Sequence, residues 1–179
     1  FAPQLVAWRV VYGSWWVDAY EGEAFTHLLA PRLVSVLVAS RHGLLTWSPL
    51  LVLALAGVPA LVTRAPVWGR ALVAWAVCLW WTNASWEQWW LGHSFGHRGF
   101  ICLFPFFAVA LASFLDGPAA RFRPAGLLAV IAACVAWNAV LMLAYLAEMI
   151  PYSGSFSWWE LVSSLPELPA AVWRKAHGG

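Results

Sequence analysis

Apolar residues fall into four long runs along the chain, and the segments between the runs hold most of the charges. The runs cover residues 44–62, 67–81, 100–115 and 126–147. A helix that crosses a bilayer perpendicularly needs about 20 mostly apolar residues. The pattern therefore predicts four membrane-spanning helices, of which the second and third are short and must borrow flanking residues or thin the bilayer.

The flanking segments are apolar but interrupted. Residues 1–17 look like the end of a helix that runs into a loop, because Arg9 and Gly13 break the apolar pattern. Residues 29–40 are too few to span a bilayer, which favours an interfacial or re-entrant helix. Residues 158–175 mix Trp with Ser, Glu and Pro, which is typical of a segment that lies on the membrane surface.

The expected fold is all-α: a polytopic integral membrane protein with about four transmembrane helices plus interfacial helices. Residues 1–43 would form the end of a preceding helix and an extracytoplasmic or interfacial segment. Residues 44–150 would form the four-span domain, and residues 151–179 an interfacial tail. Because the sequence begins at Phe1 rather than Met, we expect a piece of a longer or processed protein.

Two prolines and several polar or small residues predict details of the spans. Pro49 fits the first turn of a helix, whereas Pro105 is expected to kink the third span. Asn138 and Tyr145 lie on one face of the fourth span, which predicts hydrogen bonds to a neighbouring helix. The same span carries small residues at a spacing of four, which predicts a ridge for close helix packing: Ala125, Ala129 and Ala133.

Composition agrees with a membrane protein. Of the 179 residues, 63% are hydrophobic and only 10% are charged, whereas soluble domains carry about 25% charged residues. This composition excludes a soluble enzyme and a disordered segment. With a net charge of only +2, the chain also lacks the basic face that a nucleic-acid binder needs. The cysteines lie in apolar runs and are interpreted as small buried hydrophobes without a disulfide: Cys78, Cys102 and Cys134.

Tryptophan is unusually abundant, with 15 residues. Trp concentrates at bilayer interfaces, so interfacial anchoring is the first interpretation, and contact with a sugar or lipid through the ring faces is the second. Eleven of them lie outside the most apolar segments or at their ends: Trp8, Trp15, Trp16, Trp47, Trp68, Trp86, Trp89, Trp90, Trp158, Trp159 and Trp173.

Loop charges predict the orientation. Arg64 and Arg70 lie between the first two spans, and Arg121 and Arg123 lie between the last two. Short loops rich in Lys and Arg face the cytoplasm. This topology gathers the following residues on the extracytoplasmic side: Glu21, Glu23, His27, Arg41, His42, Glu87, His93, His97 and Arg98.

His93 and His97 are spaced i and i+4, which on a helix would suit a metal ion. Gly92, Gly96 and Gly99 argue against a regular helix, and no third ligand stands nearby in the sequence. We therefore expect no metal site here and no cofactor in the chain.

Arg41 and His42 precede the first span, beside Gly43, and Arg98 precedes the third. Such residues at a membrane boundary can hold a lipid-linked phosphate by charge-assisted hydrogen bonds, or they can snorkel to the interface. The nearby acids offer the arginines alternative partners: Glu21, Glu23 and Glu87. Glu21 and Glu23 could also bind a cation or act as acid and base, or belong to a solvated loop.

Two motifs resemble a known family: Ser-Arg-His-Gly-Leu-x-x-Trp-x-Pro at 40–49 and Trp-Trp-x-Gly-x-Ser-Phe-Gly-x-Arg at 89–98. With the pattern upstream, they are similar to the C-terminal part of bacterial polytopic membrane glycosyltransferases of the GT-C type, related to the protein-mannosyltransferase and aminoarabinose-transferase group. The resemblance spans roughly residues 1–115.

The resemblance implies transfer of a sugar from a polyprenyl-phosphate donor outside the bacterial cytoplasmic (inner) membrane. Arg41, His42 and Arg98 would contact the donor phosphate, and Trp89 and Trp90 would line a groove for sugar or lipid. The family's catalytic acid lies in an upstream loop that is not in this chain.

The chain also departs from the family pattern. The loop at 89–93 reads Trp-Trp-Leu-Gly-His where the family usually has Trp-Trp-Gly-Gly-Trp, and Gly99 stands where a second Arg often follows. These departures suit a relative that has lost its chemistry. The alternative function is a non-catalytic transmembrane subunit of a larger respiratory or photosynthetic complex.

Overall fold

The computed structural model describes residues 1–17, 22–92, 94–152 and 154–177, and in these residues helices are joined by loops, without strands. This confirms the all-α expectation. The α-helices in chain order are α1 (Ala2–Tyr12), α2 (Leu33–Val38), α3 (Leu44–Trp47), α4 (Leu50–Arg64), α5 (Pro66–Ser85), α6 (Phe104–Leu115), α7 (Pro124–Leu146), α8 (Trp158–Ser164) and α9 (Leu168–His177). Shorter 3₁₀ helices cover Arg98–Leu103, Pro118–Arg121 and Leu165–Glu167.

The first predicted span is broken into two helices, so the expectation of one continuous helix over 44–62 is wrong. Helix α3 ends at Trp47 and α4 begins at Leu50. A residue before proline is disfavoured in the α conformation, and Ser48, which precedes Pro49, has φ −133° and ψ 69°. Pro49 then serves as the N-cap of α4, close to its predicted place.

Pro105 starts a helix instead of kinking one. It lies in the first turn of α6, directly after the 3₁₀ helix Arg98–Leu103. The missing N–H of proline costs nothing in a first turn, where backbone donors have no helical acceptor. The kink expected at Pro105 is thus replaced by a change of helix type at Phe104.

Two helical segments in the described residues are long and apolar enough to cross a membrane, judged by length and composition: Arg98–Arg121 and Pro124–Leu146. They correspond to the third and fourth predicted spans. Helix α4 is apolar but has only 15 residues. Helix α5 has 20 residues, which gives it a length of about 30 Å, but Arg70, Asn83 and its tryptophans make it less apolar.

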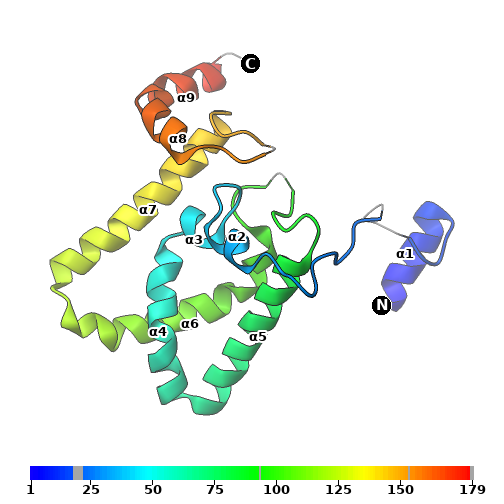
Figure 1. The fold of residues 1–179 in the computed structure, drawn as a ribbon, viewed down its shortest axis with the longest axis horizontal. Helices are drawn as coiled ribbons and strands as arrows, with labels where there is room; N and C mark the ends of the chain where they lie inside the picture. The colour runs from blue at the N-terminus through cyan, green and yellow to red at the C-terminus, as the bar shows by residue number, and fades with distance from the viewer. Residues whose placement is uncertain (18–21, 93, 153, 178–179) are drawn as a thin grey trace.

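Helices α4, α5 and α6 form the main packed unit (Figure 1). Helix α4 crosses α6 at Gly57, where a Cβ atom would lie 1.9 Å from the carbonyl oxygen of Ala110. Gly69 allows the same closeness between α5 and the end of α4, since a Cβ there would lie 2.9 Å from Cα of Val62. Glycine is thus required at both positions by the approach of a neighbouring backbone.

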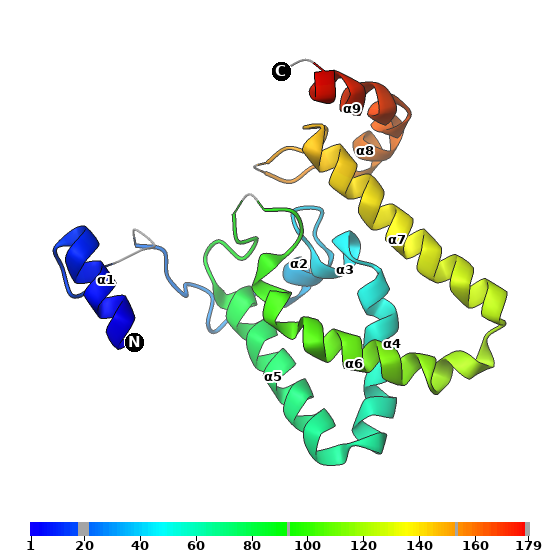
Figure 2. The ribbon, with the colours of Figure 1, turned by 180° about the vertical axis from the view of Figure 1, so that it is seen from behind.

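Helix α7 runs along the side of this unit and carries α8 and α9 at its far end, as Figures 1 and 2 show from opposite sides. Its C-terminal part packs into a second core with Trp47, Ile150 and Leu161. The amide of Asn138 donates to the backbone oxygen of Trp47 over 2.6 Å, which confirms the predicted interhelical hydrogen bond. The predicted alanine ridge is exposed, and no helix of the described residues packs against it: Ala125, Ala129 and Ala133.

The N-terminal helix α1 stands apart from the other helices in both ribbon views. None of its residues is buried, and it ends at Gly13, which adopts the left-handed conformation with φ 70°. This confirms that residues 1–17 are a helix running into a loop. The stretch 29–40 contains only the short helix α2, whose Val36 is fully buried in the main core.

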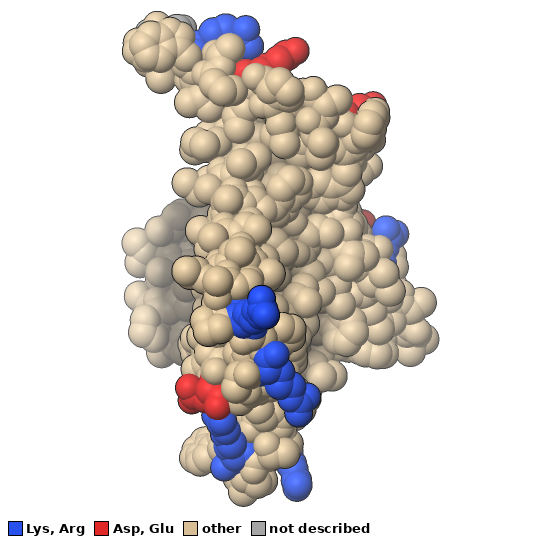
Figure 3. Space-filling model, turned by 90° about the vertical axis from the view of Figure 1, so that its left-hand side faces the viewer, with Lys and Arg blue, Asp and Glu red and all other residues tan. Residues whose placement is uncertain are grey.

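On the face drawn in Figure 3, charged side chains lie at the upper end and over the lower part, and the surface between them is largely uncharged apart from charged atoms at its right-hand edge. The two Arg-bearing loops meet at one end, where Arg64 contacts Asp116 with 3.4 Å between Nη1 and Oδ2. The structure therefore brings together the two loops that the sequence assigns to one side.

Candidate functional site

The candidate site forms where the turn at 39–43 meets the loop at 86–97. His42 has φ 59°, and its Nδ1 lies 3.2 Å from the carbonyl oxygen of Gly96. The guanidinium carbon of Arg41 lies 3.7 Å from the ring centroid of Trp90, in a cation–π contact. Gly43 closes the turn, since a Cβ there would lie 2.4 Å from the oxygen of Ala39. The Ser-Arg-His-Gly motif is thus a tight turn that presents Arg41 and His42 to the second motif.

Trp47 stabilises this turn. Its side chain is buried, and its indole N–H donates to the oxygen of Ser40 over 2.7 Å. Its ring centroid lies 5.3 Å from that of His42 and 5.1 Å from that of Phe95. Trp89 is buried as well. Interfacial anchoring is therefore the wrong interpretation for Trp47 and Trp89, because both serve as core residues that hold the two motifs together.

His97 is a buried histidine at the centre of the site. It is 7% exposed, and its ring packs edge-on against Phe100 with 4.8 Å between centroids. Burial lowers the pKa of His97 from 6.5 to about 4; the nearby His42 adds to this, and the backbone of Trp89 opposes it. His97 is therefore uncharged at neutral pH. In the sequence, the i, i+4 spacing with His93 indicated only a metal ligand. The burial of His97 could not be predicted in this way, because it depends on residues far along the chain.

Several buried polar atoms of the site have no hydrogen-bond partner among the described residues. They are Arg41 Nε, Trp89 Nε1, Ser94 Oγ and both ring nitrogens of His97. An unsatisfied buried donor or acceptor costs about 1–3 kcal/mol, and such atoms are few in native proteins. Ser94 was part of the second motif but not among the predicted site residues. A single Ser in a Gly-rich loop carries no signal for such a role.

Arg98 lies outside this cluster. It is exposed and lines a separate hollow of about 680 Å³ with Phe25, Trp86 and Leu91. Phe25 and Trp86 contact each other edge to face at 4.8 Å. The structure therefore joins Arg41, His42, Trp89 and Trp90 and puts Arg98 on another surface of the same loop.

The predicted acidic partners do not pair with the arginines in the described residues. The ion pairs found there join Arg64 to Asp116 and Lys175 to Glu148. Glu23 accepts a hydrogen bond from the side chain of Gln88, and Glu87 is exposed while its backbone N–H donates to Ala24. Glu21 lies outside the described residues.

No group of three or more His, Cys, Asp or Glu side chains in the described part of the chain is arranged to hold a metal ion. His93 lies outside that part. His42 and His97 are both buried at the site, and two imidazoles fall short of the four ligands that structural zinc takes.

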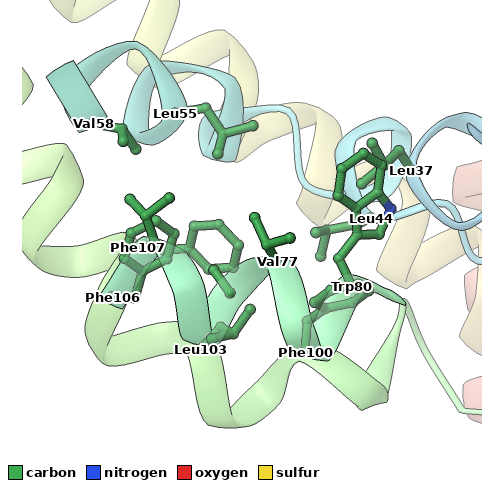
Figure 4. A pocket seen from close by; sticks show the side chains of 12 residues that line it. Leu37, Leu44, Leu55, Val58, Val77, Trp80, Phe100, Leu103, Phe106 and Phe107 are labelled. Carbon is green, nitrogen blue, oxygen red and sulfur yellow. The ribbon is translucent and has the colours of Figure 1, made fainter. Parts of the chain in front are cut away.

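An apolar pocket of about 320 Å³ opens beside the site, among α4, α5 and α6 (Figure 4). Its walls are hydrophobic side chains, and the drawn residues point into the space between the helices. Leu44 follows the Arg41–His42 turn and lines the pocket, and Phe100 lines it while packing against His97. The polar cluster and the pocket therefore share a boundary.

Comparisons of the chain with protein-family models, curated proteins and solved structures find no match.

Proposed function

We propose that this chain is a multi-pass membrane protein that binds a lipid-linked phosphate, as the C-terminal membrane portion of a GT-C-type glycosyltransferase using a polyprenyl-phosphate sugar donor. The observation that carries the proposal is the shared boundary between the polar cluster and the apolar pocket, at Leu44 and Phe100. A polyprenyl phosphate has the same division, with a charged head and a long hydrocarbon tail.

The membrane part of the proposal rests on the helices and on the charge distribution. The segments Arg98–Arg121 and Pro124–Leu146 have the length and hydropathy of spans. Helix α5 would cross beside them, and α3 with α4 would form a broken fourth span, whose free backbone groups are tolerated where protein covers them. The largely uncharged surface between the charged regions in Figure 3 would face lipid, in the bacterial inner membrane.

Arg41 suits the role of a phosphate ligand. Its guanidinium stacks on Trp90 and is partly buried, which leaves its planar edge for bidentate binding. Partial burial lowers the pKa of Arg41, but a guanidinium stays protonated at neutral pH. His42 would support it from the same turn. Arg98, in its separate hollow, would meet a different part of the donor.

The test measures binding of polyprenyl phosphate to protein in nanodiscs, with polyprenol as the ligand that lacks the phosphate. We expect wild type to prefer the phosphate and Arg41→Lys to bind it about 10-fold more weakly, because lysine keeps the charge and loses the fork. Arg174→Lys, on an exposed basic turn of α9, is the matched control and should bind like wild type. Equal affinity for the two lipids, or unchanged binding in Arg41→Lys, would refute the phosphate role.

A second candidate function is a non-catalytic subunit of a larger membrane complex. The observation that favours it is the exposed surface of α7, because only 11% of its most apolar stretch is buried within the fold. A partner helix could cover this surface as well as lipid. The alternative predicts a stable larger assembly after extraction in mild detergent, and a particle of one chain only would contradict it.

A further inference from the structure

The unsatisfied buried polar atoms of the described residues belong to two segments that pack together, the turn at 39–43 and the loop at 86–97. All of them belong to Arg41, Trp89, Ser94 and His97. Trp89 and His97 are each 7% exposed, so bulk solvent does not satisfy them. Native proteins satisfy nearly all buried polar atoms with protein, water or ligand. A cluster of such atoms therefore marks a place that some polar molecule occupies.

Contacts tie together the two segments that carry these four residues. Arg41 stacks on Trp90, and the rings of Trp90 and Trp89 lie 5.8 Å apart in an edge-to-face contact. Trp89 and His97 are both buried and lie near the two ends of this loop. Ser94 lies between them on the same loop, and the His42–Gly96 contact of 3.2 Å ties that loop to the Arg41 turn.

The chemistry of these atoms selects an anion with several oxygens. The Nε–H of Arg41 and the indole N–H of Trp89 are donors only, and the hydroxyl of Ser94 can donate. A neutral imidazole supplies one further donor. Arg41 adds a positive charge, and no carboxylate in the described residues forms an ion pair with it. Hydrogen bonds from several donors to an oxyanion are stronger than those to a neutral acceptor.

We infer that Arg41, Trp89, Ser94 and His97 together form one binding site for a phosphate group. The inference deepens the proposed function, since it assigns three further residues to the head group of the lipid donor. The same chemistry would also accept free inorganic phosphate. The two sources are separated by testing both ligands.

The experiment removes one donor at a time and measures affinity for polyprenyl phosphate and for inorganic phosphate. The variants are Trp89→Phe, Ser94→Ala and His97→Phe, which keep most of the packing and lose the donor. Matched controls change the same residue types at exposed positions of α8 and α9: Trp159→Phe, Ser163→Ala and His177→Phe. We expect each site variant to bind about 10-fold more weakly, and the controls to bind like wild type.

The outcomes distinguish this inference from the proposed function. Weaker binding of both ligands by the three site variants, or of polyprenyl phosphate alone, supports the site. A third outcome is that the variants bind inorganic phosphate more weakly, while the wild type binds polyprenyl phosphate no better than polyprenol. This result supports the site and refutes the lipid-donor function. If the three variants keep wild-type affinity while Arg41→Lys loses it, the site is overturned, water fills it, and the proposed function stands.

Failure to bind either phosphate overturns both proposals. Ser94→Ala, the smallest change, keeps the test valid if a Trp89 or His97 variant does not fold, as judged by its melting temperature.

Discussion

At the scale of single residues, burial decides what the histidines of this chain do. His27 and His177 are partly or fully open to solvent, whereas His97 is buried and its ring packs against Phe100. A charged imidazole loses its hydration there and gains no acid partner within the described residues. His97 is therefore a neutral polar group, suited to donating a hydrogen bond and unsuited to carrying charge.

Because His97 is buried and neutral in the folded chain, the free energy of unfolding depends on pH. The unfolded chain takes up a proton on His97 near its ordinary pKa of 6.5, whereas the folded chain does so only at about 4. Between these values the unfolded state binds more protons, so stability falls as the pH falls, by about 3 kcal/mol in total.

His97→Asn should flatten this acid decline, because asparagine does not titrate. The measurement is the melting temperature in detergent between pH 7 and pH 4. His177→Asn, at an exposed histidine, should keep the decline of the wild type. A decline of equal size in His97→Asn would show that other groups cause it.

At the scale of elements, the crossing of α4 over α6 sets the geometry of the main core. The crossing is close because Gly57 has no side chain to hold Ala110 and Phe114 away. Phe106, Phe107 and Ala110 are buried along α6 at a helical spacing. The position of α6 in turn sets where the 3₁₀ helix with Phe100 lies, and with it the wall between pocket and site.

Gly57→Ala should destabilise the protein by about 1–3 kcal/mol, since an added methyl group in this packed crossing forces the helices apart. Gly126→Ala is the matched control, because a Cβ there meets nothing within 4 Å. It should leave stability unchanged or raise it by up to about 1 kcal/mol, as alanine favours helix over glycine. Both are measured by thermal unfolding in detergent. Equal stability of Gly57→Ala and wild type would mean that α4 and α6 separate without cost.

At the scale of the whole molecule, charge and connectivity define two ends. One end holds the loops joined by Arg64 and Asp116. The other holds the candidate site, where backbone N–H groups of His27 and Arg32 donate to Ser85 and Ala84 at the end of α5. In a membrane, the positive-inside rule puts the Arg-rich end in the cytoplasm.

We predict that cysteines at Val67 and Ala120, both exposed at the Arg-rich end, are protected from a membrane-impermeant thiol reagent in intact cells. Leu29→Cys, exposed at the opposite end, should react. The background variant replaces the native Cys78, Cys102 and Cys134. Reaction of the first two positions with protection of the third would reverse the topology.

The sequence alone determined the helical class, the location of the apolar segments and the pairing of the two Arg-rich loops. These follow from local hydrophobic pattern and loop charge, which need no knowledge of distant contacts. From the resemblance of the two motifs to parts of one family, it also predicted a site that contains Arg41, His42, Trp89, Trp90 and Arg98, of which the structure puts Arg98 in a separate hollow.

Only the tertiary structure decided what surrounds each residue. The break at Ser48, the start of α6 at Pro105 and the exposed face of Ala125 depend on how helices pack. The burial of Trp47 and His97, the separation of Arg98 and the unsatisfied atoms of Trp89 and Ser94 arise where segments about 50 residues apart meet, as His42 and Gly96 do. Burial and hydrogen bonding are properties of such long-range contacts, and the residue types and their spacing do not encode them locally.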